Sequence, residues 1–162
     1  GIAFAEELKK QGKSFLVYED RSQTSSLVAG GMYNPVILKR FTPVWNAKEQ
    51  LDVAMPFYAS LEAELATSFD QKLDIYRTFK SIEEQNNWFI ASDKPLLQEY
   101  MHPELVKLES SHVVSPFKAG RVNQTGRIRV RELVSTYRDH LKKNGQLLEE
   151  TFRHERIITW EN

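Results

Sequence analysis

The first nineteen residues constrain the fold most tightly, because they hold a helical pattern, a glycine and a short apolar run in that order. Ile2, Ala5 and Leu8 recur at helical spacing, and Gly12 follows where a helix commonly ends in the left-handed conformation. Residues 14–18 form an apolar run typical of a short buried strand, and an acidic residue comes next. This order predicts a helix, a tight turn and a strand.

The spacing between Gly1 and Glu19 is that of a dinucleotide-binding βαβ unit. In such a unit the third glycine of Gly-x-Gly-x-x-Gly lies in the first turn of the helix, and about 20 residues later an acid binds the adenosine ribose. Because the chain opens inside this helix without an initiator Met, we expect the first strand and two glycines to precede it. Taken alone, this pattern is more often a solvated strand end.

The loop after the strand favours a cofactor over that alternative. Phe15-Leu-Val-Tyr-Glu-Asp20 and Thr24-Ser-Ser-Leu-Val-Ala-Gly-Gly-Met-Tyr-Asn-Pro35 resemble the strand end and flavin loop of the D-amino-acid-oxidase and glycine-oxidase family. Small residues let a backbone approach a pyrophosphate or a flavin, and hydroxyl groups donate to phosphate oxygens. The resemblance spans nearly the whole chain and is most specific over residues 15–35.

The resemblance implies that FAD is the cofactor and assigns it a set of contacts. The implied cofactor-binding residues are Gly1, Glu19, Asp20, Ser25, Ser26, Gly30, Gly31 and Met32. Glu19 would bind the adenosine ribose, the two serines the phosphate and ribityl region, and the last three residues would lie along the flavin ring. Alternatives for single residues are helix capping by Ser25 and Ser26 and a turn at Gly30 and Gly31.

Helical patterns recur farther along the chain. A long amphipathic helix is expected over residues 46–67, within which Pro56 predicts a kink or a boundary. Ser81-Ile-Glu-Glu84 has the capping-box pattern for a second helix that carries Trp88. A third helix begins near residue 130 and stops at Asn144-Gly145. Its apolar face consists of Leu133, Val134, Tyr137 and Leu141.

Strand patterns are shorter than the helical ones. Residues 73–79 alternate as a half-buried strand, and residues 146–152 and 156–160 are expected to form two more strands. Residues 93–120 are irregular because prolines interrupt them, with a weak strand signal at Val113-Val114.

These elements predict a mixed α/β fold with a partial FAD-binding Rossmann-like βαβ unit and part of a substrate-domain sheet with helices. We expect residues 1–45 to form part of the FAD-binding domain. Residues 46–125 are expected to form a helix and part of the substrate domain, and residues 126–162 a return helix and strands toward the FAD domain.

Charge and composition exclude several classes of function. The 22 Lys and Arg match 22 Asp and Glu, so no excess positive charge favours a nucleic acid, an anionic membrane or a tRNA-modifying role. The absence of cysteine excludes disulfides and thiolate catalysis.

No apolar run approaches the roughly 20 residues of a membrane span, and the cytoplasm is the expected compartment. No metal is predicted, because metal-ligand spacing is missing around His102, His112, His140 and His154.

Several other prominent side chains are expected to have structural roles and not catalytic ones. Three arginines before and within the third helix are expected to form a solvated basic face, with a substrate-carboxylate site as the alternative: Arg127, Arg129 and Arg131. The tryptophans Trp45, Trp88 and Trp160 are expected in the core or at an interface. Glu62, Glu64, Glu83 and Glu84 are expected to be ordinary exposed helix charges.

The sequence therefore predicts a piece of an FAD-dependent oxidoreductase that oxidises an amine or amino acid by hydride transfer to flavin. The resemblance places the catalytic residues beyond Asn162, so we expect the piece itself to be inactive and to bind FAD weakly. The alternative is a cofactor-free module that self-associates through exposed strand edges.

Overall fold

The computed structural model describes residues 1–109, 112–113 and 115–159, and it confirms the mixed α/β class. The chain divides into two units. Unit 1 comprises the described residues of 1–29 and 130–162, and unit 2 comprises those of 30–129. The sequence-based domain boundaries follow residues 45 and 125, whereas the units change over after Ala29 and Arg129.

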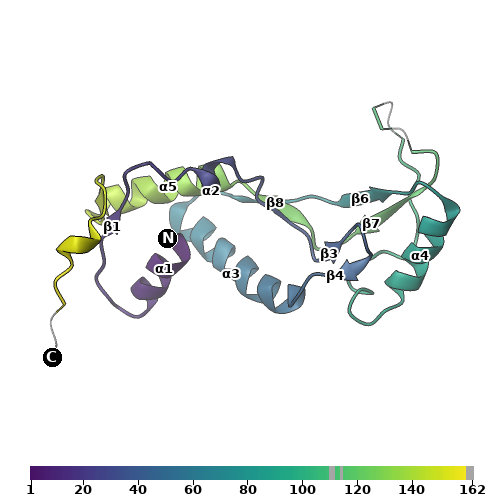
Figure 1. Cartoon of the computed structure of the whole chain (residues 1–162), viewed down its shortest axis with the longest axis horizontal. Helices are drawn as coiled ribbons and strands as arrows, with labels where there is room; N and C mark the ends of the chain where they lie inside the picture. The colour runs from purple at the N-terminus through teal and green to yellow at the C-terminus, as the bar shows by residue number, and fades with distance from the viewer. Residues whose placement is uncertain (110–111, 114, 160–162) are drawn as a thin grey trace. The chain divides into compact units, whose positions relative to one another are not determined.

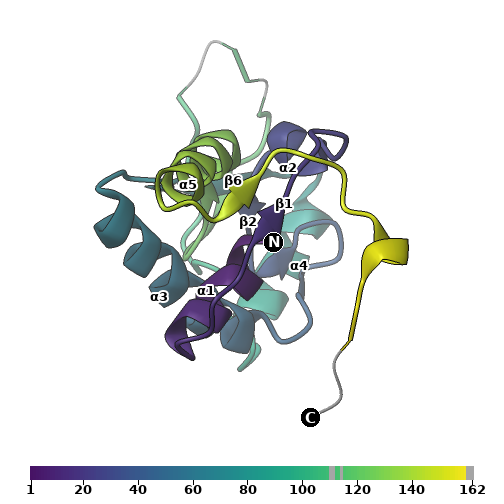
Figure 2. The ribbon, with the colours of Figure 1, turned by 90° about the vertical axis from the view of Figure 1, so that its left-hand side faces the viewer.

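Unit 1 is built around a pair of parallel strands (Figures 1 and 2). Its elements are α1 (Ile2–Lys10), β1 (Val17–Tyr18), α2 (Ser25–Val28), α5 (Val130–Lys143), β9 (Leu147–Leu148) and the 3₁₀ turn η1 (His154–Arg156). The predicted helix, turn and strand are confirmed, and Gly12 has a φ of +65°. The strand is shorter and less buried than expected, since Leu16 is 54% exposed.

Helices α1 and α5 contact each other through a buried polar pair. The predicted face of α5 is confirmed, because Leu133, Tyr137 and Leu141 are buried. The Tyr137 hydroxyl donates to Glu6 Oε1 at 2.7 Å, and Lys9 Nζ lies 3.5 Å from the same carboxylate. A carboxylate in a helix interface is tolerated only when such partners satisfy it.

The C-terminal segment differs from the two predicted strands. Only Leu147 and Leu148 of residues 146–152 form a strand, and residues 154–156 form the 3₁₀ turn η1. The prediction for residues 156–160 is therefore wrong at its start, and Trp160 lies outside the described residues. The predicted strand signal at Val113-Val114 also includes a residue outside the described ranges.

Unit 2 contains three small antiparallel sheets and two helices (Figure 1). The sheets pair β2 (Met32–Tyr33), β8 (Gly126–Ile128) and β5 (Asp70–Lys72); β3 (Val36–Ile37) and β4 (Thr42–Pro43); and β6 (Ile75–Thr78) and β7 (Ala119–Val122). The helices are α3 (Ala47–Leu65) and α4 (Ile82–Ser92).

Helix α3 continues through Pro56, so the predicted boundary there is wrong. Proline has no N–H to offer the carbonyl four residues earlier, which belongs to Asp52. Both residues are exposed, so water can satisfy that carbonyl without ending the helix. None of the helices in the described ranges has the length and apolar character needed to cross a membrane.

The core of unit 2 is centred on Trp88, which is fully buried on α4. Its ring meets Phe41 and Phe79 edge-to-face, with centroid distances of 5.5 and 5.6 Å, and its Nε1 donates to the His102 carbonyl at 3.0 Å. Ser81 caps α4 as predicted by accepting the Glu84 N–H at 3.2 Å.

Two acidic residues that were expected to be exposed helix charges instead accept hydrogen bonds from backbone N–H groups in unit 2. Glu62 Oε1 accepts the Asp70 N–H at 2.7 Å and also the Phe69 N–H, which fixes the start of β5. Glu84 accepts the Lys80 N–H at 2.8 Å and pairs with Arg77 at 3.0 Å. Both acids are half-buried, so that expectation is wrong for them.

Gly120 on β7 generates a test of this core. A Cβ atom there would lie 2.4 Å from Trp88 Cε2, whereas a Cβ at Gly30 would meet no atom within 4 Å. We expect Gly120→Ala to lower the free energy of unfolding by about 1–3 kcal/mol, because the buried indole must shift. Urea denaturation measures this, with Gly30→Ala as the control. Equal stability of the two variants would contradict the packing described here.

Candidate functional site

A pocket of about 240 Å³ in unit 1 gathers three of the predicted cofactor-binding residues, Gly1, Glu19 and Ser26. They come from the N-terminus of α1, the end of β1 and the first turn of α2. The remaining lining is mostly apolar and comes from α1, β1, the loop to α2, α2, α5 and β9: Ile2, Ala5, Val17, Gln23, Leu27, Val134, Tyr137, Arg138, Leu141 and Leu147.

Glu19 is half-buried and takes part in a charge network at the ends of the parallel strands. Arg138 on α5 donates from Nε to Glu19 Oε2 and from its other end to Glu149. The Arg138 charge, followed by that of Lys142, holds the pKa of Glu149 below its ordinary value. In the described chain Glu19 Oε1 has no hydrogen-bond partner, so one oxygen of this carboxylate is left for a ligand hydroxyl.

Asp20 lies outside the pocket and fixes the loop that follows β1. Its Oδ1 accepts from the Ser22 hydroxyl at 2.6 Å and the Ser22 N–H at 3.0 Å, while Oδ2 accepts from the Thr151 hydroxyl at 3.0 Å. The Ser22 hydrogen bonds lower the pKa of Asp20. The structure thus gives Asp20 a bracing contact between the segment after β1 and the segment after β9.

Ser25 and Ser26 lie in the first turn of α2, but neither caps it. The N-cap is Thr24, whose side chain makes no capping bond. No protein partner is present within the described residues for the hydroxyls of Ser25 and Ser26. A Cβ at Gly1 would meet no atom within 4 Å, so packing inside the described chain does not require glycine there.

The predicted flavin-ring residues Gly30, Gly31 and Met32 belong to unit 2. Gly31 has a φ of +69°, which explains a glycine there by backbone conformation alone, whereas Gly30 has neither a positive φ nor a crowded Cβ position. Met32 on β2 is 67% exposed and is paired in register with Arg127 on β8.

Next to Met32, the side chain of Tyr33 joins a cluster that sequence reasoning missed. The Tyr33 hydroxyl donates to Asp70 at 2.7 Å and accepts from Lys72 Nζ at 3.0 Å, and burial raises its pKa. Asp70 and Lys72 are separated from Tyr33 by more than thirty residues and meet it only because β2 and β5 flank β8. No local pattern in the sequence signals this contact.

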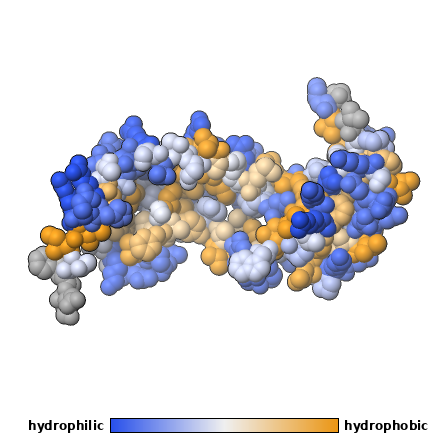
Figure 3. Space-filling view, viewed as in Figure 1, coloured by the Kyte–Doolittle hydropathy of each residue, from blue (hydrophilic) through white to orange (hydrophobic). Residues whose placement is uncertain are grey.

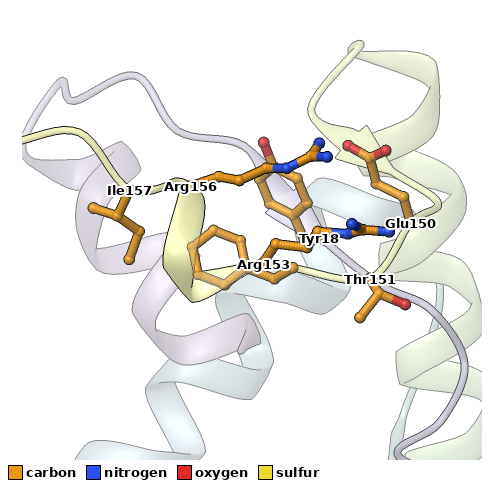
Figure 4. Close-up of a pocket in the computed structure, with 7 residues that line it drawn as sticks. Tyr18, Glu150, Thr151, Arg153, Arg156 and Ile157 are labelled. Atoms are coloured by element: carbon orange, nitrogen blue, oxygen red, sulfur yellow. The ribbon is translucent and has the colours of Figure 1, made fainter.

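A second pocket in unit 1, of about 200 Å³, lies along the segment after β9 (Figure 4). Tyr18 and Phe152 meet edge-to-face in it at 5.0 Å, and the side chains of Arg153 and Arg156 extend past the Tyr18 ring (Figure 4). Phe152 and Arg156 were expected in two separate strands, and that expectation gave no sign of this pocket, to which the 3₁₀ turn contributes Arg156.

No protein-family model matches the chain, and no solved structure matches it. The interpretation of the site therefore rests on its residues and their geometry. Within residues 1–109, 112–113 and 115–159, no three His, Asp or Glu side chains gather in a metal-binding arrangement.

The network around Arg138 predicts a pH dependence of stability. Because the pKa of Glu149 is lowered in the folded chain, its contribution is present above the unfolded value near 4.5 and is lost as the pH falls through the folded value. We expect Glu149→Gln to lower the Tm at neutral pH and the difference from the wild type to shrink as the pH falls below the unfolded value near 4.5. A Tm difference that is constant across this range would contradict the network.

Proposed function

We propose that unit 1 binds the adenosine diphosphate half of FAD and that the parent protein is an FAD-dependent oxidoreductase acting on an amine or amino acid. The observation that carries the proposal is the meeting of Gly1, Glu19 and Ser26 around one pocket. Each had been assigned to the cofactor from the sequence, and they come from three different elements.

The charges around the pocket suit a diphosphate and a ribose. Helix α1 has no acid in its first turn, so its N-terminal N–H groups and dipole favour an anion there. The unpaired Glu19 oxygen can accept from a ribose hydroxyl, and the Ser26 hydroxyl can donate to a phosphate. The open space at Gly1 leaves room for a ligand to approach the backbone.

The topology of unit 1 gives further support. Strands β1 and β9 are parallel neighbours, and Glu19 and Glu149 come directly after their carboxyl ends. Ligands of open parallel sheets bind in the crevice at this edge. When bound, a flavin supplies a hydride acceptor, and the protein positions the substrate against it.

The role of Glu19 is tested in the full-length protein by Glu19→Gln, with Glu149→Gln as the matched control. Both variants remove a carboxylate from Arg138, but only Glu19 lines the pocket. We expect Glu19→Gln to weaken FAD binding about tenfold or more, as loss of a charge-assisted hydrogen bond does, and Glu149→Gln to retain the wild-type affinity. FAD titration followed by flavin fluorescence measures both. Equal affinities for the two variants would contradict the ribose role.

A second candidate function is self-association through β1. This strand pairs only with β9 in the described part of the chain, and Leu16 beside it is exposed, as are other apolar side chains on the molecular surface (Figure 3). An open strand edge with apolar neighbours is a template for pairing with another chain. If this candidate function is right, Leu16→Lys abolishes dimers seen by light scattering, and Val53→Lys, at a still more exposed apolar site on α3, does not. A wild-type chain that stays monomeric at all concentrations excludes this reading.

A further inference from the structure

Unit 2 contains a pocket whose lining residues take no part in the proposed cofactor site. Its volume is about 610 Å³, which lies within the usual range of roughly 300–1,000 Å³ for small-molecule sites. It is formed by the β3–β4 pair, the first turn of α3 and the segment 95–100. The apolar lining residues are Ile37, Pro43, Val44, Trp45, Ala47, Pro95 and Leu96.

Trp45 lines the pocket as an exposed aromatic ring. Trp45 is 79% exposed, which excludes the core and leaves the interface alternative of the expectation untested. Leu96, which also lines the pocket, is 71% exposed. The next residue, Asn46, adopts a left-handed conformation with a φ of +47°, which asparagine tolerates better than most residues. Gln50 Nε2 holds the Trp45 carbonyl at 2.8 Å, so the backbone that presents the indole is fixed.

Tyr100 supplies a polar group in the same pocket. The residue is only 4% exposed and lines the pocket, yet its hydroxyl has no hydrogen-bond partner in the described chain. The hydroxyl oxygen is not among the buried side-chain atoms that lack a partner, so water reaches it. A ligand in the pocket that carries a hydrogen-bonding group can replace that water.

The charges around the pocket favour a cation. Glu49 and Glu99 line it, and the one lining cation, Lys48, is neutralised by Asp52 at 3.2 Å. The N-terminus of α3 contributes only about half a positive charge, which two carboxylates outweigh. Glu99 accepts from Gln124 Nε2 at 2.8 Å, and no ion pair holds Glu49 among the described residues.

We propose that this pocket binds an organic ammonium ion that carries an apolar group. The ammonium would lie near Glu49 and Glu99 and against the Trp45 face, and one of its N–H groups would donate to the Tyr100 hydroxyl. The apolar group would cover the aliphatic and proline side chains. The inference does not rest on the proposed flavin function, because all lining residues belong to unit 2 and binding needs no flavin.

The test titrates the 162-residue chain with benzylammonium and follows backbone amide resonances by NMR. Benzyl alcohol and benzoate serve as the neutral and anionic counterparts of the same shape. We expect benzylammonium to shift amides of residues 43–49 and 95–100 in a saturable way, with at least about fivefold weaker binding of the other two compounds. Equal or tighter binding of benzoate, or shifts confined to other residues, would overturn the proposal.

Variants identify the groups responsible. Trp45→Leu is expected to weaken benzylammonium binding about three- to fivefold, and Tyr100→Phe by a similar factor. Glu83→Gln, on the exposed face of α4, should leave it unchanged. Because Trp45 is exposed, its variant is expected to fold even if removal of the Tyr100 hydroxyl disturbs the core. Unchanged affinity in Trp45→Leu would refute the site.

Discussion

Unit 1 depends on one guanidinium group, that of Arg138. The two parallel strands are only two residues long, and backbone hydrogen bonds join the Val17 N–H to the Gln146 carbonyl and the Glu19 N–H to the Leu148 carbonyl. Arg138 pairs at once with Glu19 and Glu149, which follow the two strands. Without it, two carboxylates would lie close together at the sheet edge and repel each other. The cation therefore fixes the edge at which an open parallel sheet binds its ligand.

The ion pair with Arg138 is compatible with the ribose contact proposed for Glu19. One oxygen of Glu19 takes the Arg138 hydrogen bond, and the other has no hydrogen-bond partner in the described residues, while the residue lines the pocket. The hydrogen bond from Arg138 holds the Glu19 carboxylate in place. Asp20 acts differently, because Ser22 and Thr151 occupy both of its oxygens.

The parts of the fold that could be predicted from the sequence are those with a strong local pattern. The helices α3, α4 and α5 show apolar periodicity or a capping box, and each lies where it was expected. Strand β5 was missed because Asp70-Gln-Lys72 has no apolar alternation. It exists because β8 pairs with it and Glu62 holds its first N–H groups.

The residues of the candidate site also differ in whether the local sequence could predict them. Glu19 could be predicted because the acid follows a strand at a fixed distance from Gly1. Arg138 could not, since it lies 119 residues farther along the chain and meets Glu19 only in the folded unit. Trp45 and Trp88 illustrate the limit for aromatic residues: their local sequences do not distinguish the exposed pocket ring from the buried core ring.

We propose above that unit 1 forms half of a flavin site. The most direct measurement is the visible absorbance spectrum of the full-length protein after reconstitution with excess FAD and removal of free cofactor by gel filtration. The account predicts a flavin spectrum at about one FAD per chain that disappears on denaturation and release. A protein that leaves the column colourless after reconstitution would contradict it.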